Sequence, residues 1–154
     1  MINFLLSIIV SIFSLLAQDQ DIVSYKADCV SVTEGGVVTL RIWHINYGKK
    51  YKIEQAEKDA VAYILYEGFS GGKCEYISPL LKTYELKYEF EDTHMYFFKK
   101  SGDYDKYVVS SKISEVKPNH VKDETWSVYE IEINKKLLDE YLVKKEIKSK
   151  IDIY

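Results

Sequence analysis

The first seventeen residues of the sequence decide which part of the chain is available to fold, and in which compartment. They read MINFLLSIIVSIFSLLA, of which thirteen are apolar and none is charged, and the run Gln18-Asp19-Gln20-Asp21 follows at once. An apolar stretch of this length that ends at a small residue, here Ala17, is typical of a secretory signal peptide. We therefore predict a signal peptide over residues 1–17 and a single domain over residues 18–154.

A permanent membrane anchor is the alternative interpretation of the same segment. The uncharged stretch Phe4–Leu16 spans about 20 Å as a helix, at about 1.5 Å per residue, whereas a bilayer core requires about 20 residues. Two features are atypical of a signal peptide: no Lys or Arg precedes the apolar stretch, and Leu15 occupies the −3 position. We expect cleavage after Ala17, no stable membrane span afterwards, and a periplasmic or secreted mature protein.

The charge of the chain argues against one class of partner. Its 21 basic and 24 acidic residues are interleaved, and Arg41 is the only arginine. Nucleic-acid-binding domains concentrate basic side chains in a patch or stripe. We therefore expect no nucleic-acid partner.

Apolar periodicity and turn residues predict an α+β fold in which a small antiparallel sheet of three to four strands carries helices on one face. The segments expected to form strands are Tyr25–Val32, Val37–Ile45, Tyr107–Val116 and Thr125–Ile133. Helical segments are expected over Ile53–Tyr66, over Leu80–Lys100 as one or two pieces, and from Lys135 to about Lys148 with Asn134 as the N-cap.

The helix at Ile53–Tyr66 has the clearest pattern. An apolar stripe at helical spacing is formed by Ile53, Ala56, Ala60, Tyr63 and Ile64, while Glu54, Glu57 and Lys58 are expected to face away. The alanines allow the helix to approach a sheet closely, and Gly68 is the expected C-terminal residue of the turn that ends the helix.

Two cysteines, Cys29 and Cys74, enter an oxidising compartment if the signal peptide directs export. A disulfide bond between them is one interpretation, and two separate thiols with one buried in a strand is the other. The first predicts that the strand region at Cys29 is tied to the loop that follows the helix.

No arrangement of reactive residues indicates catalysis, a metal or a cofactor. The histidines His44, His94 and His120 lack metal-ligand spacing. A Cys74–His94 nucleophile pair is conceivable, but a disulfide explains Cys74 more simply. Acidic clusters such as Glu89-Phe90-Glu91-Asp92 lack the facing partner that a glycosidase needs. We predict no catalytic, cofactor or metal residues and a protein that is not an enzyme.

The many aromatic residues allow two interpretations. Tyrosine combines a large apolar ring with a polar tip, so it suits both the edge of a core and a stacking surface for a sugar or a protein. The residues that we expect to form a binding surface, if there is one, are Trp43, Trp126, Tyr104 and Tyr107.

The segment TLRIWHINYGKKYKIEQAEKDAVAYILYEGF combines a strand, a break at Gly48, alanines four apart and a closing Gly68. It resembles the strand–helix signature of small bacterial envelope proteins, such as the amino-terminal domain of the flagellar assembly protein T and related short outer-membrane lipoproteins. It is more similar to uncharacterised secreted proteins of Bacteroidetes type. In those, an aromatic helix like MYFFKK, an element like GDYDKYV and a final strand and helix like YEIEINKKLLDEYL follow. The resemblance implies an envelope component without known catalysis; the lipid-attachment cysteine of the lipoproteins is absent.

Three functions follow as hypotheses. The first is a non-enzymatic envelope module that acts through contact with another envelope protein. The second is binding of glycan or peptidoglycan through exposed Tyr and Trp. The third is a small hydrolase or an enzyme inhibitor. Exposure of Trp43, Trp126 or several tyrosines along a groove favours the second hypothesis. A flat apolar patch or an open sheet edge favours the first, and a buried pocket with convergent acid and His groups favours the third.

Overall fold

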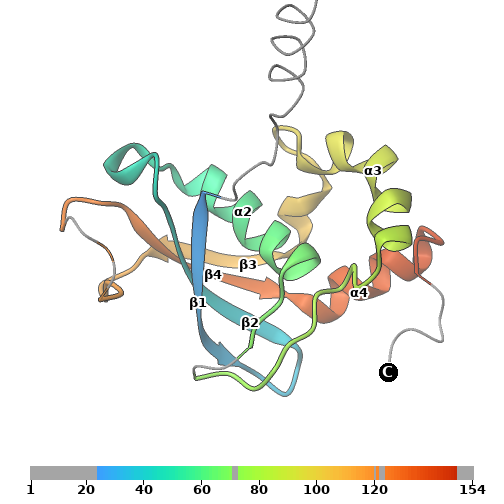
Figure 1. The fold of residues 1–154 in the computed structure, drawn as a ribbon, viewed down its shortest axis with the longest axis horizontal. Coiled ribbons are helices and arrows are strands. Elements are labelled where there is room, and N and C mark those ends of the chain that lie inside the picture. Colours follow the sequence, from blue (N-terminus) through green and yellow to red (C-terminus); the bar gives the residue numbers. More distant parts are fainter. Residues whose placement is uncertain (1–23, 71–72, 120, 122–123, 149–154) are drawn as a thin grey trace, which may run out of the picture.

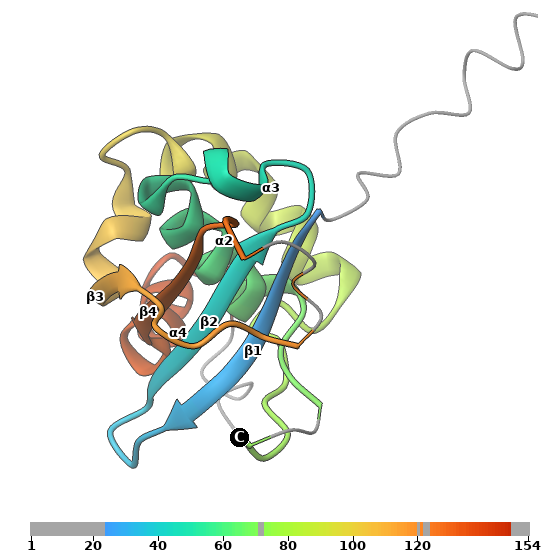
Figure 2. The same cartoon turned by 90° about the vertical axis from the view of Figure 1, so that its left-hand side faces the viewer.

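The computed structural model describes residues 24–70, 73–119, 121 and 124–148, and the predicted signal peptide lies outside them. Four antiparallel strands form one sheet in the order β1-β2-β4-β3. The predicted α+β class is confirmed, and Figures 1 and 2 show the helices gathered on one side of this sheet. The elements in chain order are β1 (Tyr25–Val32), β2 (Val37–His44), η1 (Gly48–Lys50), α2 (Ile53–Tyr66), α3 (Tyr84–Phe98), η2 (Asp103–Tyr107), β3 (Val108–Ile113), β4 (Val128–Asn134) and α4 (Lys135–Lys144).

The central strands β2 and β4 supply the sheet side of the core. Val38, Leu40 and Ile42 alternate along β2 and are fully buried. Opposite them in the antiparallel register lie Ile133, Ile131 and Tyr129 of β4. Alternation of apolar and polar residues is the pattern of a strand with one face against a core.

Helix α2 lies across the sheet and has the predicted bounds. Ala56, Ala60 and Ile64 are fully buried, as expected. The expectation was wrong at three positions: Ile53 is exposed, whereas Glu57 and Lys58 are half-buried. Oε1 of Glu57 accepts a hydrogen bond from the Ser111 hydroxyl of β3 at 2.6 Å.

Gly68 follows α2 with φ +67°, and a Cβ at this position would lie 2.3 Å from the carbonyl oxygen of Ile77. Only glycine adopts this backbone without strain while allowing the close approach.

The segment predicted as helical over Leu80–Lys100 divides into two parts. The amides of Leu80 and Leu81 donate to the carbonyls of Ile64 and Leu65 at 3.1 and 2.8 Å, so this stretch closes the end of α2 instead of starting a helix. Helix α3 begins after Thr83, whose hydroxyl accepts from the Leu86 amide.

The last predicted strands and helix differ from the structure only at their ends. Tyr107 belongs to η2, so β3 begins at Val108, and β4 begins at Val128 instead of Thr125. Asn134 caps α4 as predicted by accepting from the Leu137 amide at 3.0 Å, and α4 ends at Lys144.

The other face of the sheet is covered in part by the connection between β3 and β4, which Figure 2 shows crossing in front of β2. Arg41 of β2 lies on this face, where it pairs with Glu130 of β4 at 2.8 Å and donates to Ser114 at 3.0 Å. The guanidinium group holds the pKa of the Glu130 carboxyl below its usual value.

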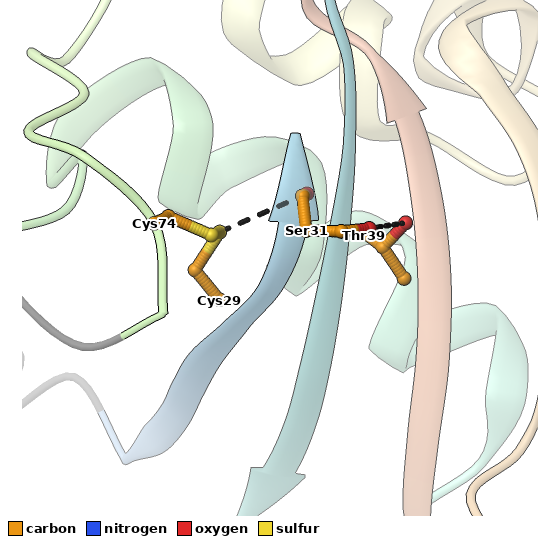
Figure 3. The surroundings of a disulfide bond; sticks show 4 residues. All are labelled: Cys29, Ser31, Thr39 and Cys74. Atoms are coloured by element: carbon orange, nitrogen blue, oxygen red, sulfur yellow. Dashed lines mark hydrogen bonds between the residues drawn. A yellow bond between two sulfur atoms is a disulfide. The ribbon is translucent and has the colours of Figure 1, made fainter. Parts of the chain in front are cut away.

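The predicted disulfide bond is present. Cys29 of β1 and Cys74 are bonded with a Cα–Cα distance of 5.9 Å (Figure 3). The bond ties the segment after α2 to an edge strand of the sheet. In the part of the chain that the structure describes, no helix has the length and apolar character needed to cross a bilayer.

Candidate functional site

Most of the side chains predicted to form a binding surface lie in the interior. Trp43, Tyr104 and Tyr107 are buried, which corrects that prediction. Trp43 lies on the sheet face that the β3–β4 connection crosses, Tyr104 stacks on Phe98 at a ring distance of 6.2 Å, and Tyr107 stacks on Phe97 at 5.9 Å. The fourth, Trp126, is half-buried, with its indole against Gly48.

Two tyrosines that were not predicted to form a binding surface are exposed. Tyr84 and Tyr88, one turn apart on α3, are 79% and 66% exposed. With Tyr66 of α2 and with Lys87, Glu91 and His94 of α3 they line a depression of about 300 Å³, which we call the tyrosine groove. Exposed aromatic side chains along a groove are one of the features that favour the glycan hypothesis.

A second depression, of about 590 Å³, adjoins the tyrosine groove at Tyr66 and His94, which line both. We call it the His44 pocket. It is formed where the start of β1, the end of β2, the middle of α2 and the end of α3 meet; its wall consists of Ser24, Tyr25, His44, Gln55, Lys58, Asp59, Ala62, Tyr66, His94 and Phe98.

Asp59 supplies the carboxylate of the His44 pocket. It is only 6% exposed, on the buried side of α2. Its Oδ2 accepts from the Tyr51 hydroxyl and its Oδ1 from the Gln55 amide, each at 2.7 Å. Burial raises the pKa of the Asp59 carboxyl above its usual value, although both hydrogen bonds oppose that shift. The carboxylate is held in one orientation by groups of its own helix and of the residues just before it.

His44 supplies a fixed donor. Its Nδ1 accepts from the backbone amides of Asn46 and Tyr47 at 3.2 and 3.3 Å. The neutral ring therefore carries its proton on Nε2. Burial lowers the pKa of His44, and the ring stacks on Tyr47 at 4.0 Å.

The aromatic wall of the pocket is uncharged at neutral pH. His94 packs against Phe98 at a ring distance of 4.8 Å and against Tyr66 at 6.3 Å. Burial lowers the pKa of His94 and raises that of Tyr66 to about 12. The pocket thus combines aromatic faces, a neutral donor, the Lys58 ammonium group and one carboxylate, which is a set of groups suited to binding a small polar ligand.

The His44 pocket brings Asp59 together with His44 and His94, which is the combination of acid and His groups named for the enzyme hypothesis. The two specific reactive sites considered from the sequence, a Cys–His pair and a metal site, are not formed in the described chain. Cys74 is bonded to Cys29, so the conceivable Cys74–His94 nucleophile pair does not exist. Within the described ranges, no three His, Cys, Asp or Glu side chains are placed to hold a metal ion. His120 lies outside the described residues.

Sequence analysis singled out His44 and His94 but missed Asp59 and the exposed tyrosines. One signal for Asp59 was available: it stands between Ala56 and Ala60 on the apolar stripe of a helix, where a carboxylate is rare without a partner. For Tyr84 and Tyr88 the sequence carries no comparable signal.

A larger depression, of about 660 Å³, lies beside β1 and includes Ser70 and Lys73, which flank residues outside the described chain. It contains no histidine. The His44 pocket and the tyrosine groove therefore form the candidate site.

Comparison with protein-family models, curated proteins and solved structures finds no match for this chain. The resemblance to secreted envelope proteins accordingly remains a prediction from the sequence, and the functional argument depends on the geometry of the site.

Proposed function

We propose that the protein is a non-enzymatic, extracytoplasmic module that binds a glycan along the tyrosine groove and the His44 pocket. The observation that carries the proposal is the joining of these two depressions at Tyr66 and His94. An elongated site with aromatic faces and inward polar groups suits a short oligosaccharide, whose rings have apolar faces and hydroxyl edges.

An extracytoplasmic location is supported by two observations. The disulfide bond between Cys29 and Cys74 is of the kind that persists in oxidising compartments. The apolar segment over residues 1–17 independently predicts export.

Binding without hydrolysis is supported by the count of carboxylates. Glycoside hydrolases generally place two carboxyl groups across the scissile bond, about 5–9.5 Å apart. Among the described residues, Asp59 is the one carboxylate that lines the His44 pocket and Glu91 is the one that lines the tyrosine groove, so neither depression by itself holds a facing pair.

The experiment is an NMR titration of the mature protein with three β-1,4-linked trisaccharides, of glucose, of N-acetylglucosamine and of glucosamine. We expect chemical-shift changes for at least one of them, centred on Tyr66 and His94. The double variant Tyr84→Ala/Tyr88→Ala should weaken binding about tenfold or more, since each stacked ring contributes about 0.5–1.5 kcal/mol.

Tyr76→Ala is the matched control, because Tyr76 is 72% exposed but lies outside the groove. Tyr76→Ala should bind the trisaccharides with the affinity of the unmodified protein. The mass of each trisaccharide should not change on incubation with the protein. Absence of shift changes with all three sugars would contradict the proposal, and cleavage would favour a hydrolase.

Contact with an envelope protein, the first hypothesis from the sequence, is the second candidate because β3 is an open edge. Within the described chain β3 pairs with β4 alone, and the side chains of Val109 and Ile113 are more than half exposed. An edge strand with free backbone groups accepts a further strand from a partner. The shift in register between Val108 and Ser110 and the exposed Lys112 are features that limit uncontrolled pairing.

A photo-crosslinking residue tests the edge in the native host. Placed at Ile113 it should yield one discrete adduct, and placed at Tyr76 it should yield none. An adduct that disappears in a Val109→Pro background would support strand addition; equal labelling from both positions would contradict it.

A further inference from the structure

The carboxylate of Asp59 is buried without a cation in contact. Among the described residues it makes no ion pair, and its two hydrogen-bond donors, Tyr51 and Gln55, are neutral. A buried carboxylate that is hydrogen-bonded but unpaired still costs free energy, so a ligand that brings positive charge gains by pairing with it.

The groups that face Asp59 from each neighbouring element compensate this charge only in part: Lys58 and His44 oppose the rise in the pKa of its carboxyl, but burial outweighs them. His44 at the end of β2 and His94 on α3 both have pKa values lowered by burial, so both are neutral near pH 7. Lys58 on α2 is the one ammonium group in the pocket wall, but it lies 3.5 Å from Glu54 and 5.4 Å over the ring of Tyr104.

The aromatic wall favours a cation as well as a sugar ring. Tyr25, Tyr66 and Phe98 line the same pocket as Asp59. The face of an aromatic ring attracts a nearby ammonium group, and it also stacks on the apolar face of a pyranose. A sugar that carries an amine therefore meets both features at once.

We propose that the His44 pocket selects glycans with a free amine, such as glucosamine units, and that Asp59 is the group that receives the ammonium. This inference rests on the glycan binding proposed above and adds the class of sugar. An N-acetyl group at the same position of the sugar carries no charge and should be disfavoured.

The test compares the three trisaccharides on the unmodified protein by calorimetry at pH 7. We expect the glucosamine trisaccharide to bind at least about tenfold more tightly than the other two, the factor that one charge-assisted hydrogen bond supplies. Equal affinity for all three, or tighter binding of the N-acetylated sugar, would overturn the inference while leaving glycan binding intact. No binding by any sugar would instead contradict the proposed function.

A variant and a second measurement assign the preference to Asp59. In Asp59→Asn the affinity for the glucosamine trisaccharide should fall to that for the glucose trisaccharide, with the latter unchanged. If the variant does not fold, carbon-13 NMR of the Asp59 carboxyl in the unmodified protein decides the question. Its pKa should fall on addition of the glucosamine trisaccharide but not of the N-acetylated one, and an unchanged pKa in both cases would overturn the assignment.

Discussion

At the scale of single residues, Asp59 makes the protein's stability depend on pH in an unusual direction. Most carboxyl groups in folded proteins have pKa values lowered by nearby cations, as Asp103 does beside Lys106. Burial instead raises the pKa of Asp59. The folded state therefore holds the Asp59 proton more tightly than the unfolded state does, and the associated stability is lost as pH rises through the folded-state pKa.

The sign of this pH dependence leads to a prediction for Asp59→Asn. The unmodified protein should lose free energy of unfolding through Asp59 as pH rises from 4 to 7, whereas the variant should not, because asparagine does not ionise. The free energy of unfolding of the variant minus that of the unmodified protein should therefore be larger at pH 7 than at pH 4. Urea unfolding at both pH values measures the difference. Asp103→Asn is the control and should show little relative change over this range, because the pKa of its carboxyl is lowered in the folded protein and its contribution to stability is lost only below about pH 4. A relative loss of stability for Asp59→Asn as pH rises would contradict the account.

Ala60 is the second residue at which a substitution should change stability. It is fully buried in the middle of α2, where the helix lies across the sheet. Ala60→Leu should lower the free energy of unfolding by about 1–3 kcal/mol, because a larger side chain must displace well-packed neighbours.

The control for Ala60→Leu has to avoid Glu57, since that side chain is half-buried and bonded to Ser111. Glu54→Leu is suitable, because Glu54 is exposed and its ion pair with Lys58 at 3.5 Å joins neighbouring turns of one helix. It should change stability by no more than about 0.5 kcal/mol. Equal loss in both variants would mean that the buried face of α2 has been assigned wrongly.

At the scale of elements, the disulfide bond joins the segment after α2 to the edge strand β1. The stretch from Phe69 to Ile77 is closed by one isolated pair of backbone hydrogen bonds, and Cys74 inside it is bonded to Cys29 of β1. The cross-link therefore adds a covalent tie to a segment whose described residues form one isolated bridge and no helix or strand.

Removing the disulfide bond should lower the free energy of unfolding substantially. The bonded cysteines are 45 residues apart in the sequence, and the chain-entropy relation gives about 4 kcal/mol for a loop of that size. The Cys29→Ser/Cys74→Ser variant and the reduced parent protein should lose similar free energy of unfolding in denaturant titrations. A loss below about 1 kcal/mol in both would show that the segment is held by other contacts.

At the scale of the whole molecule, one prediction concerns the mature chain. If residues 1–17 are removed on export, the protein purified from its native host begins at Gln18, and its intact mass shows this together with a mass two hydrogens lower for the disulfide bond. A full-length species extracted from membranes would instead support an uncleaved anchor.

Local interactions explain what could be read from the sequence. The bounds of α2, the cap at Asn134 and the turn at Gly68 were predicted correctly, since each depends on side chains within about one helical turn. The strand expected over Val37–Ile45 is likewise present as β2, because side chains alternate between the two faces of a strand.

Only the tertiary structure decided which aromatic and charged residues form a site. Trp43 and Tyr104 are buried while Tyr84 and Tyr88 are exposed, and no local pattern distinguishes them. The His44 pocket exists because segments from four elements pack together, with β1 and α3 separated by some fifty residues of chain. The secondary structure was determined locally, but the burial of Asp59 and the convergence of side chains on it depend on packing between distant segments.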